Sequence, residues 1–552
     1  MAPAPLVRIA AAYLTGVCLA STIKGCFLSA ATFVVLIVAG IIITLFCFKG
    51  LFSPAYRTTH KRQAGIKPTS LLTASNQILQ GTGMVVLFII LGLLRSGISY
   101  NRILKAYIPS GHTTITAVEP PTEKEKTWAV KGHTDTSNEY ILLFIQKDSL
   151  HNPSGIQSGD IISVNPLHIS YTYGTRSAAD TANVLPADYY IHHHIFATEY
   201  ATYDEWHTNS TSNRLIYRIR RLQSDITKRY KSSLKMDYDE LALIEALSIG
   251  STGRLKGTHG KRSSLKSRYA TAGVSHVVAL SGFHVGLLYI LLNILFMGKL
   301  FTWRYRWIPT ALIILSLWAF ALIAGMQPSL TRAVLMLTII SVSSLISHKT
   351  MGIDSIFLAA LIMTVYDPFM LFDVGFQLSY VAVAAISLSQ PILYKIFIKI
   401  EKARINSVVK FFSSYVISCL LLSVVCHIAT IGLSAHYYGF TAPLGIVSGL
   451  LVCTLSILLI YATVMWWMFN TVGFIGDFLG DTVETLSTWT NGSVDWFART
   501  GYIFSWQPSA LETLAYYMSL IAAILYFRSG KAAWLITALL LALLTILSMW
   551  IH

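Results

Sequence analysis

Three windows of the sequence place polar or charged side chains at helix-breaking positions inside long apolar runs. They are Ser281-Gly282-Phe283-His284, Gly325-Met326-Gln327-Pro328-Ser329-Leu330-Thr331-Arg332, and a stretch from Asp367-Pro368 to Asp373-Val374-Gly375-Phe376-Gln377-Leu378-Ser379. Gly, Ser and Pro interrupt helices, and His or Arg at membrane depth is costly unless it faces water, an acid, a carbonyl or a phosphate. The windows therefore predict interrupted helices that line a polar pathway. Its candidate residues are Ser281, Gly282, His284, Gln327, Arg332, Asp367, Asp373, Gln377 and Ser379.

Each window also fits a purely structural explanation. His284 and Gln377 are compatible with hydrogen bonds to neighbouring helices, and Arg332 with a snorkelling or paired side chain. Asp367 and Asp373 suit a turn and a helix N-cap. The residue types alone leave both interpretations open.

Enzyme motifs are scarce. There is no P-loop, no Gly-x-Ser-x-Gly and no zinc signature of the His-x-x-Glu-His kind. His192, His193 and His194 would alternate faces on a strand and lack acidic or Cys partners at suitable spacing, so a solvated or rim position is predicted. The six cysteines all lie in or beside apolar segments, which excludes a disulfide framework in the polar stretch 97–273. We expect no metal, no cofactor and no catalytic residue.

Composition indicates what positions these windows. Hydrophobic residues make up 54% of the 552-residue chain and charged residues only 12%, against about 25% charged in soluble domains. Apolar runs such as Phe27 to Phe48, Val274 to Leu295, Ile308 to Ile323 and Trp534 to Trp550 approach the length that crosses a bilayer. The sequence predicts a polytopic α-helical membrane protein with roughly ten or more membrane segments, some broken or re-entrant. The stretch 443–476 is too long for one span and short for two, so we expect a tight hairpin or re-entrant pair there.

Basic loops predict the orientation. Lys and Arg gather at 49–67, 299–306, 395–410 and 528–531, which is typical of cytoplasmic loops. Residues 6–48 fit a retained helical hairpin rather than a cleaved signal peptide. We expect a multi-pass protein of the cytoplasmic (inner) membrane with a cytoplasmic N-terminus. Residues 97–273 and the acidic stretch 477–505 would then lie outside that membrane.

The outer segment begins with a β pattern. Runs at 112–118, 127–132, 139–147 and 160–164 are rich in β-branched and aromatic residues and are separated by turn residues. They predict a small β-barrel of the OB-fold type, although a small sandwich fits equally well. The expected domains are transmembrane helices over 1–96, the barrel over 97–212, a basic amphipathic helix over 213–239, a channel core over 240–505 and C-terminal transmembrane helices over 506–552.

Positive charge gathers between the barrel and the core. Residues 97–212 contain 7 basic and 12 acidic side chains (net −5), whereas 213–235 contain 8 basic against 1 acidic (net +7) and 250–269 contain 6 basic and no acidic (net +6). A polyanion approaching from outside would be concentrated there; docking on anionic lipid is the alternative. The candidate DNA-binding residues are Arg214, Arg218, Arg220, Arg221, Lys228, Arg229, Arg254, Lys256, Lys261, Arg262, Lys266 and Arg268.

In this order, the three windows resemble the ComEC family of competence DNA-uptake channels. The resemblance rests on Ala246-Leu247-Ser248-Ile249-Gly250, on the block from His276 to Val285, on Pro328-Ser329-Leu330-Thr331-Arg332-Ala333, and on the block from Asp373 to Ser379. It covers roughly residues 240–505, and the upstream barrel looks like the family's N-terminal domain. The resemblance implies passage of single-stranded DNA across the inner membrane during natural transformation.

One departure limits what the resemblance implies. Many family members carry a metallo-β-lactamase-like domain with a His-x-His-x-Asp-His motif, and that motif is absent from this sequence. We therefore expect no intrinsic nuclease. The expected partners are single-stranded DNA, membrane lipid, a periplasmic DNA-binding protein, a separate nuclease and a cytoplasmic motor or single-strand-binding protein, with a homo-oligomer as a further option. The rival functions are transport of another anionic polymer or a lipid-linked intermediate, and a membrane-embedded enzyme using His284, Arg332 and the Asp residues.

Overall fold

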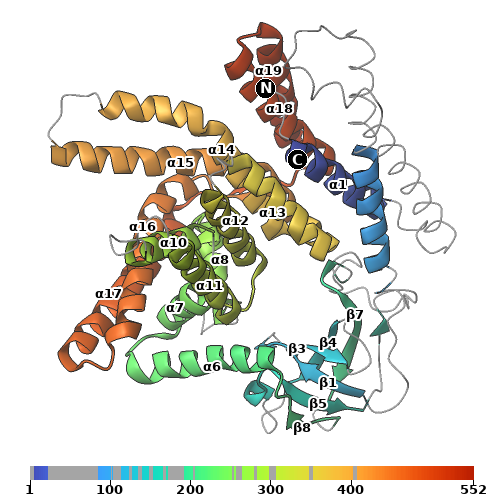
Figure 1. Ribbon diagram of the computed structural model, residues 1–552, viewed down its shortest axis with the longest axis vertical. Coiled ribbons are helices and arrows are strands. Elements are labelled where there is room, and N and C mark those ends of the chain that lie inside the picture. Colours follow the sequence, from blue (N-terminus) through green and yellow to red (C-terminus); the bar gives the residue numbers. More distant parts are fainter. Residues whose placement is uncertain are drawn as a thin grey trace, which may run out of the picture. The chain divides into compact units, whose positions relative to one another are not determined.

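The computed structural model describes residues 5–22, 85–100, 102, 113–123, 127–134, 140–147, 153–165, 170–171, 190, 192–202, 205–251, 254–256, 264–278, 282–296, 306–346, 352–401 and 407–551 (Figure 1). The chain divides into two compact units. The first unit comprises Met1–Arg218 and Thr338–Asp373, and the second comprises Ile219–Leu337 and Val374–His552.

A β-sheet forms one part of the first unit. Its strands are β1 (Thr113–Ala117), β2 (Thr122–Glu123), β3 (Thr127–Thr134), β4 (Tyr140–Gln146), β5 (Asp160–Val164), β6 (Ser170–Tyr171), β7 (Ile195–Ala201) and β8 (Trp206–Thr211), with a short 3₁₀ helix η2 (Pro153–Gly155). The strand order is β6-β7-β4-β3-β1-β5-β8, with β2 paired to β3. The β4–β7 pair is parallel and the other pairs are antiparallel.

The four predicted strand runs are confirmed as β1, β3, β4 and β5. The predicted closed barrel is not what the described strands form, because the path ends at β6 and β8 and these two strands are not paired with each other. Ile141, Leu143 and Ile145 alternate along β4 and are fully buried, as the two-residue period of a strand requires. They belong to a core that also contains Phe369, from far along the chain.

Glu199 on β7 lies on the core side of this sheet. It is 0% exposed, and Ala197 and Ala201, two residues to either side, belong to the core. Neither of its carboxylate oxygens has a hydrogen-bond partner among the described residues. Burial, together with the nearby charge of Glu205, raises the pKa of Glu199 to about 7.

This carboxyl predicts a pH-dependent sheet. Unfolded Glu titrates near 4.3, so the folded sheet holds an extra proton between about pH 4.5 and 7, and its stability falls with rising pH across that window by up to roughly 3 kcal/mol. Glu199→Gln should stabilise the sheet at pH 8 and change little at pH 4. Pulse proteolysis of the purified protein measures this, with the exposed Glu119→Gln as control. Equal stability of Glu199→Gln and parent at pH 8 would contradict it.

Three apolar helices complete the first unit. They are α1 (Pro5–Thr22), a helix over Val85–Tyr100 and α13 (Gly352–Tyr366), which ends at the 3₁₀ helix η5 (Pro368–Phe372). Gly16 and Gly92 lie at the crossing of the first two helices, where a Cβ on either would clash with the opposite backbone. Arg95, at the predicted exit of the third apolar run, donates from Nε to the carbonyl of Val365 at 2.7 Å.

Helices dominate the second unit. They are α6 (Leu215–Ser233, which begins in the first unit), α7 (Tyr238–Ile249), η3 (Arg254–Lys256), α8 (Leu265–Thr271), α9 (Ser275–Val278), α10 (Gly282–Phe296), α11 (Trp307–Ile323), α12 (Pro328–Leu345), α14 (Val374–Glu401), α15 (Ser407–Tyr438), α16 (Gly445–Phe469), α17 (Gly473–Thr500), α18 (Ala510–Ser529) and α19 (Ala532–Ile551). Two short strands, β9 (Phe440–Thr441) and β10 (Phe504–Ser505), pair antiparallel. One apolar core joins α7, α8, α16 and α17, and another joins α10, α11 and α12.

The helices confirm a membrane protein but not ten or more full-length spans. Among the described residues, four helices are long and apolar enough to cross a bilayer: Pro328–Leu345, Ser413–Tyr438, Gly445–Phe469 and Ala510–Phe527. Shorter apolar helices lie at Arg8–Ala20, Val85–Tyr100, His284–Phe296, Trp307–Ile323, Asp354–Tyr366, Val374–Gln390 and Ala532–Thr545. The predicted run from Phe27 to Phe48 lies outside the described residues.

One local prediction was wrong. The stretch 443–476 is not a hairpin in itself, because α16 runs unbroken over Gly445–Phe469 and pairs with the following helix α17. The predicted basic amphipathic helix forms as α6, and on its apolar side Tyr230 is buried whereas Leu215 and Leu222 are exposed. Periodicity locates an apolar side, but it does not indicate how much of that side a partner covers.

Candidate functional site

The residue blocks identified in the sequence meet in the second unit. Gln327, just before α12, donates from its side-chain amide to the carbonyl of Gly250, which ends α7. Gly250 has φ +69°, a conformation that favours glycine. Gln223 of α6 donates to the adjacent carbonyl of Ile249 at 2.9 Å. Two glutamines thus satisfy carbonyls that the end of α7 leaves without helical partners.

A second contact joins α10 to α12. Gly282, at the start of α10, lies so close to α12 that an added Cβ would be 3.2 Å from the Cβ of Ala333. His284 lies two residues after Gly282, about half a helical turn further along α10, and it is buried. Arg332 directly precedes Ala333 on α12. The two predicted pathway residues therefore lie on neighbouring helices. Ser281 lies outside the described residues.

A third contact joins α12 to α14 through Arg332. This side chain is 1% exposed, and its guanidinium carbon lies 5.6 Å from the ring centre of Phe376 and 5.1 Å from that of Tyr380. Its Nη2 donates to the carbonyl of Gly375 at 3.4 Å. Stacking on aromatic rings is favourable for a guanidinium, most of all where water is excluded. Arg332 is thus held against the first turns of α14.

Gln377 and Ser379, two further residues predicted for the pathway, both lie on α14. Gln377 accepts a hydrogen bond from the Tyr437 hydroxyl of α15 at 2.9 Å, and Ser379 is half-buried on α14. Nearby on α9, His276 lies with Nε2 at 3.8 Å from the Cys453 sulfur of α16. His276 is not among the residues predicted for the pathway, although it opens the same sequence block as His284.

Asp367 and Asp373 belong to the first unit. Asp367 accepts from the backbone N–H of Phe369 and caps η5, as the alternative reading proposed. It also lies 3.0 Å from Nε2 of His194. His192 stacks on Phe372 with ring centres 4.7 Å apart. The three histidines are half-buried, which is compatible with the predicted rim position. His192 and His194 join the sheet to η5.

The segment from His192 to His194 has an unusual backbone angle and a histidine with a shifted pKa. His194 has φ +56°, a left-handed backbone that is uncommon for a residue with a side chain. The pKa of His193 is lowered, first by burial and then by Lys131, against the opposing pull of Asp373 and Asp367. Its neutral form is therefore favoured. Spacing could not reveal this contact, because 173 residues separate His194 from Asp367.

The predicted DNA-binding residues differ in exposure: some basic side chains are exposed to solvent, and others form ion pairs with acidic residues. On and just beside α6, the side chains of Arg214, Arg218, Lys228, Arg229, Lys231 and Lys235 are exposed, whereas Arg220 and Arg221 are half-buried. Lys228 lies 3.4 Å from Asp225, with both groups about two-thirds exposed, which makes this a weak pair.

The second basic stretch contributes less free charge. Arg268 is 9% exposed and donates to Asp239 and, at 2.6 Å, to Asp495. Arg254 pairs with the buried Glu245 at 3.4 Å. Lys266 is exposed. Lys261, Arg262 and the side chain of Lys256 lie outside the described residues. Arg268 and Arg254 therefore hold helices of the second unit together, and we leave them out of the DNA-binding surface.

A family model, Competence protein, matches residues 258–530. Through this stretch, the chain belongs to the competence protein family. The match contains Gly282, His284, Arg332 and the start of α14, where the helix contacts converge. ComE operon protein 3 of Bacillus subtilis (strain 168) is 26% identical over 224 residues, or 40% of this chain. The alignment spans 27% of that relative's length. No solved structure matches the chain.

Proposed function

We propose that this competence-family protein conducts single-stranded DNA across the inner membrane into the cytoplasm during natural transformation. The observation that carries the proposal is Arg332, a guanidinium held within apolar helices where the blocks at 246–250, 281–285, 328–333 and 373–379 converge. A passing strand needs its phosphates paired or hydrated, and a purely apolar lumen provides neither. Gly282, His284, Gln327, Arg332, Gln377 and Ser379 are the described residues of this proposed pathway.

In the same proposal, the exposed basic side of α6 receives the DNA. Its phosphates would contact Arg214, Arg218, Lys228, Arg229 and Lys231. The acidic balance of the preceding sheet would keep the polyanion from binding there instead. A periplasmic DNA-binding protein would deliver the strand, a separate nuclease would degrade its complement, and a cytoplasmic motor or single-strand-binding protein would draw it inward.

The test compares a deletion strain with its parent. Loss of cytoplasmic DNA delivery, with normal envelope polymers, supports the proposal. Normal delivery together with an altered glycan or lipid-linked intermediate would instead identify transport of another anionic polymer, since the charge of α6 suits any polyanion.

A further inference from the structure

Helices α16 and α17 form an antiparallel hairpin with a closed base and a three-residue tip. Residues 470–472 join the two helices, which pack side by side. At the base, Phe504 pairs with Thr441 and Ser505 with Phe440. Helix α16 is a membrane-length helix by its 25 residues and its composition. Length alone would therefore place the tip on the opposite side of the bilayer from the base.

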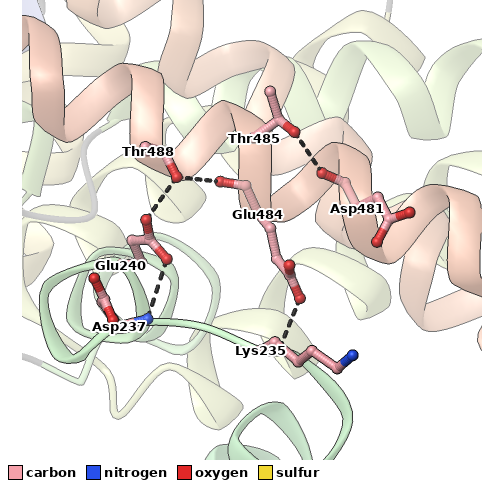
Figure 2. Close-up of a pocket in the computed structure, with 7 residues that line it drawn as sticks. All are labelled: Lys235, Asp237, Glu240, Asp481, Glu484, Thr485 and Thr488. Atoms are coloured by element: carbon pink, nitrogen blue, oxygen red, sulfur yellow. Dashed lines mark hydrogen bonds between the residues drawn. The ribbon is translucent and has the colours of Figure 1, made fainter.

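Contacts of α17 and of the last turn of α16 with α6 and the α6–α7 turn argue against that placement. The backbone N–H of Lys235, just after α6, donates to Oε1 of Glu484 at 2.6 Å, and Thr488 donates to Oε1 of Glu240 at 2.5 Å (Figure 2). These residues line an open pocket of about 460 Å³ in which the α6–α7 turn meets α17. Glu484 and Thr488 lie within α17, 12 and 16 residues past the tip, whereas Trp467 of α16 lies three residues before it. Trp467 donates to the Tyr230 hydroxyl of α6 at 2.7 Å, which places the end of α6 beside the tip end of the hairpin.

Helix α6 cannot lie within the hydrocarbon layer. The segment 213–235 carries 8 basic residues against Asp225, and each Lys or Arg at the bilayer centre costs about 2.5–3.5 kcal/mol. Its insertion would cost on the order of 20 kcal/mol. The tip is consequently on the same side of the membrane as α6.

The base lies on that side as well. Ser448, near the start of α16, donates to the carbonyl of Ala272 at 2.6 Å, and Gly273 and Gly445 approach backbone to backbone. The chain from α6 at the tip to Ala272 at the base includes the stretch 250–269, with 6 basic residues and no acid. Arg254 and Arg268 of this stretch pair with acids, but placing its other four basic side chains within a bilayer would still cost on the order of 10 kcal/mol. Both ends of the hairpin are therefore on one side.

The charge of the tip agrees with an outer location. From 470 to 484 the chain carries Asp477, Asp481 and Glu484 and no Lys or Arg. Cytoplasmic loops carry an excess of Lys and Arg, as the loops at 299–306, 395–410 and 528–531 do. The tip lacks this excess of basic residues.

The outward side of the hairpin is apolar along its length. On α17, Phe474, Phe478, Trp489 and Trp496 are 84%, 62%, 60% and 60% exposed. On α16, Val447, Leu451, Leu458 and Met465 are exposed. The opposite side of α17 is buried through small residues such as Gly476, Gly480 and Ser487. A Trp- and Phe-rich stripe beside acidic residues suits a helix that lies in the membrane–water interface.

We propose that the α16–α17 hairpin does not cross the membrane but lies along its surface on the side of α6, with its aromatic stripe docked on the bilayer. The partner is lipid itself. Because the hairpin is acidic, the docking relies on the aromatic and aliphatic side chains and needs no anionic headgroup. This placement is independent of whether DNA is the transported molecule.

Single-cysteine labelling tests the placement. Val472 at the tip is 47% exposed, and Val472→Cys is made in a variant without native cysteines. Glu119→Cys in the outer segment and Lys531→Cys in a basic loop, both exposed, mark the two sides. The outer membrane is first removed, and a membrane-impermeant maleimide is added while the cytoplasmic membrane is intact. It should label Val472→Cys together with Glu119→Cys. Labelling only after cell opening, together with Lys531→Cys, would overturn the proposal.

Fluorescence quenching tests the docking and decides the case in which Val472→Cys labels from neither side. The purified protein is placed in zwitterionic vesicles with bromine near the headgroup or near the chain end. The quenchable signal of Trp489 and Trp496 is the difference between parent and a Trp489→Phe, Trp496→Phe variant. We expect at least twofold stronger quenching by the shallow bromine. Stronger quenching by the deep bromine would mean a spanning hairpin, and no quenching at all would mean no bilayer contact; either result contradicts the proposal.

Discussion

Replacing Arg332 with alanine should stop DNA delivery to the cytoplasm while leaving DNA bound at the cell surface. The guanidinium lies against the adjacent rings of Phe376 and Tyr380, within helices that exclude water. A hydrogen bond to a charged group is worth about 2 kcal/mol, so loss of the phosphate contact with a passing strand corresponds to roughly 30-fold in the delivery rate. Delivery is measured as labelled DNA protected inside cells, and surface binding as nuclease-sensitive label.

Two controls separate the charge from the packing. Arg332→Lys keeps the charge but loses the planar group that stacks on rings, so partial delivery is expected. Tyr380→Phe keeps the ring and should deliver DNA normally, whereas Tyr380→Leu should resemble Arg332→Ala. Wild-type delivery by Arg332→Ala, at equal protein level in the membrane, would remove Arg332 from the pathway.

Neutralising the exposed side of α6 should weaken DNA binding and flatten its salt dependence. The variant combines Arg218→Gln, Lys228→Gln and Lys231→Gln, three exposed positions. Each single-strand phosphate contact contributes about 0.7 to the slope of log affinity against log salt, so three contacts lower the slope by about 2. Raising salt from about 50 to about 200 mM should then weaken the variant roughly 15- to 20-fold less than the parent. Affinity of the purified protein for labelled single strands provides the measurement.

The matched control removes the same number of charges elsewhere. Arg8→Gln, Arg499→Gln and Lys531→Gln are also exposed and lie outside the proposed surface. This control should bind like the parent and keep its salt slope. If the α6 variant also binds like the parent but is lost from anionic vesicles, α6 is a lipid-docking helix and does not receive DNA.

The sequence was sufficient where a signal is local. The strand runs in the outer segment, the basic helix and the apolar helices all follow from residue periodicity, and β4 and α6 appear where the pattern predicts them. Arg332 could be selected because an Arg within an apolar run is rare. Its partners could not be named, since Phe376 and Tyr380 are more than 40 residues away and only helix packing brings them together.

Features that depend on residues far apart in the chain could not be predicted from the sequence. The contact of His194 with Asp367 crosses 173 residues. The pairing of α16 with α17 was missed because 443–476 was divided by length, whereas the small residues of α17, Gly476 and Gly480, are what admit α16. Arg268 counted as free charge until Asp239 and Asp495 were found against it. Closure of the sheet depends on pairing of its edge strands, which no strand pattern encodes.

Uptake of labelled DNA by cells with and without this protein tests the central claim most directly. DNA labelled on both strands is offered to competent cells, and the label is divided into a surface fraction and a cytoplasmic, single-stranded fraction. We predict that deletion leaves the surface fraction intact and removes the cytoplasmic fraction, and that the parent chain restores it whereas Arg332→Ala does not. Cytoplasmic label at the parental level in the deletion strain would contradict the account.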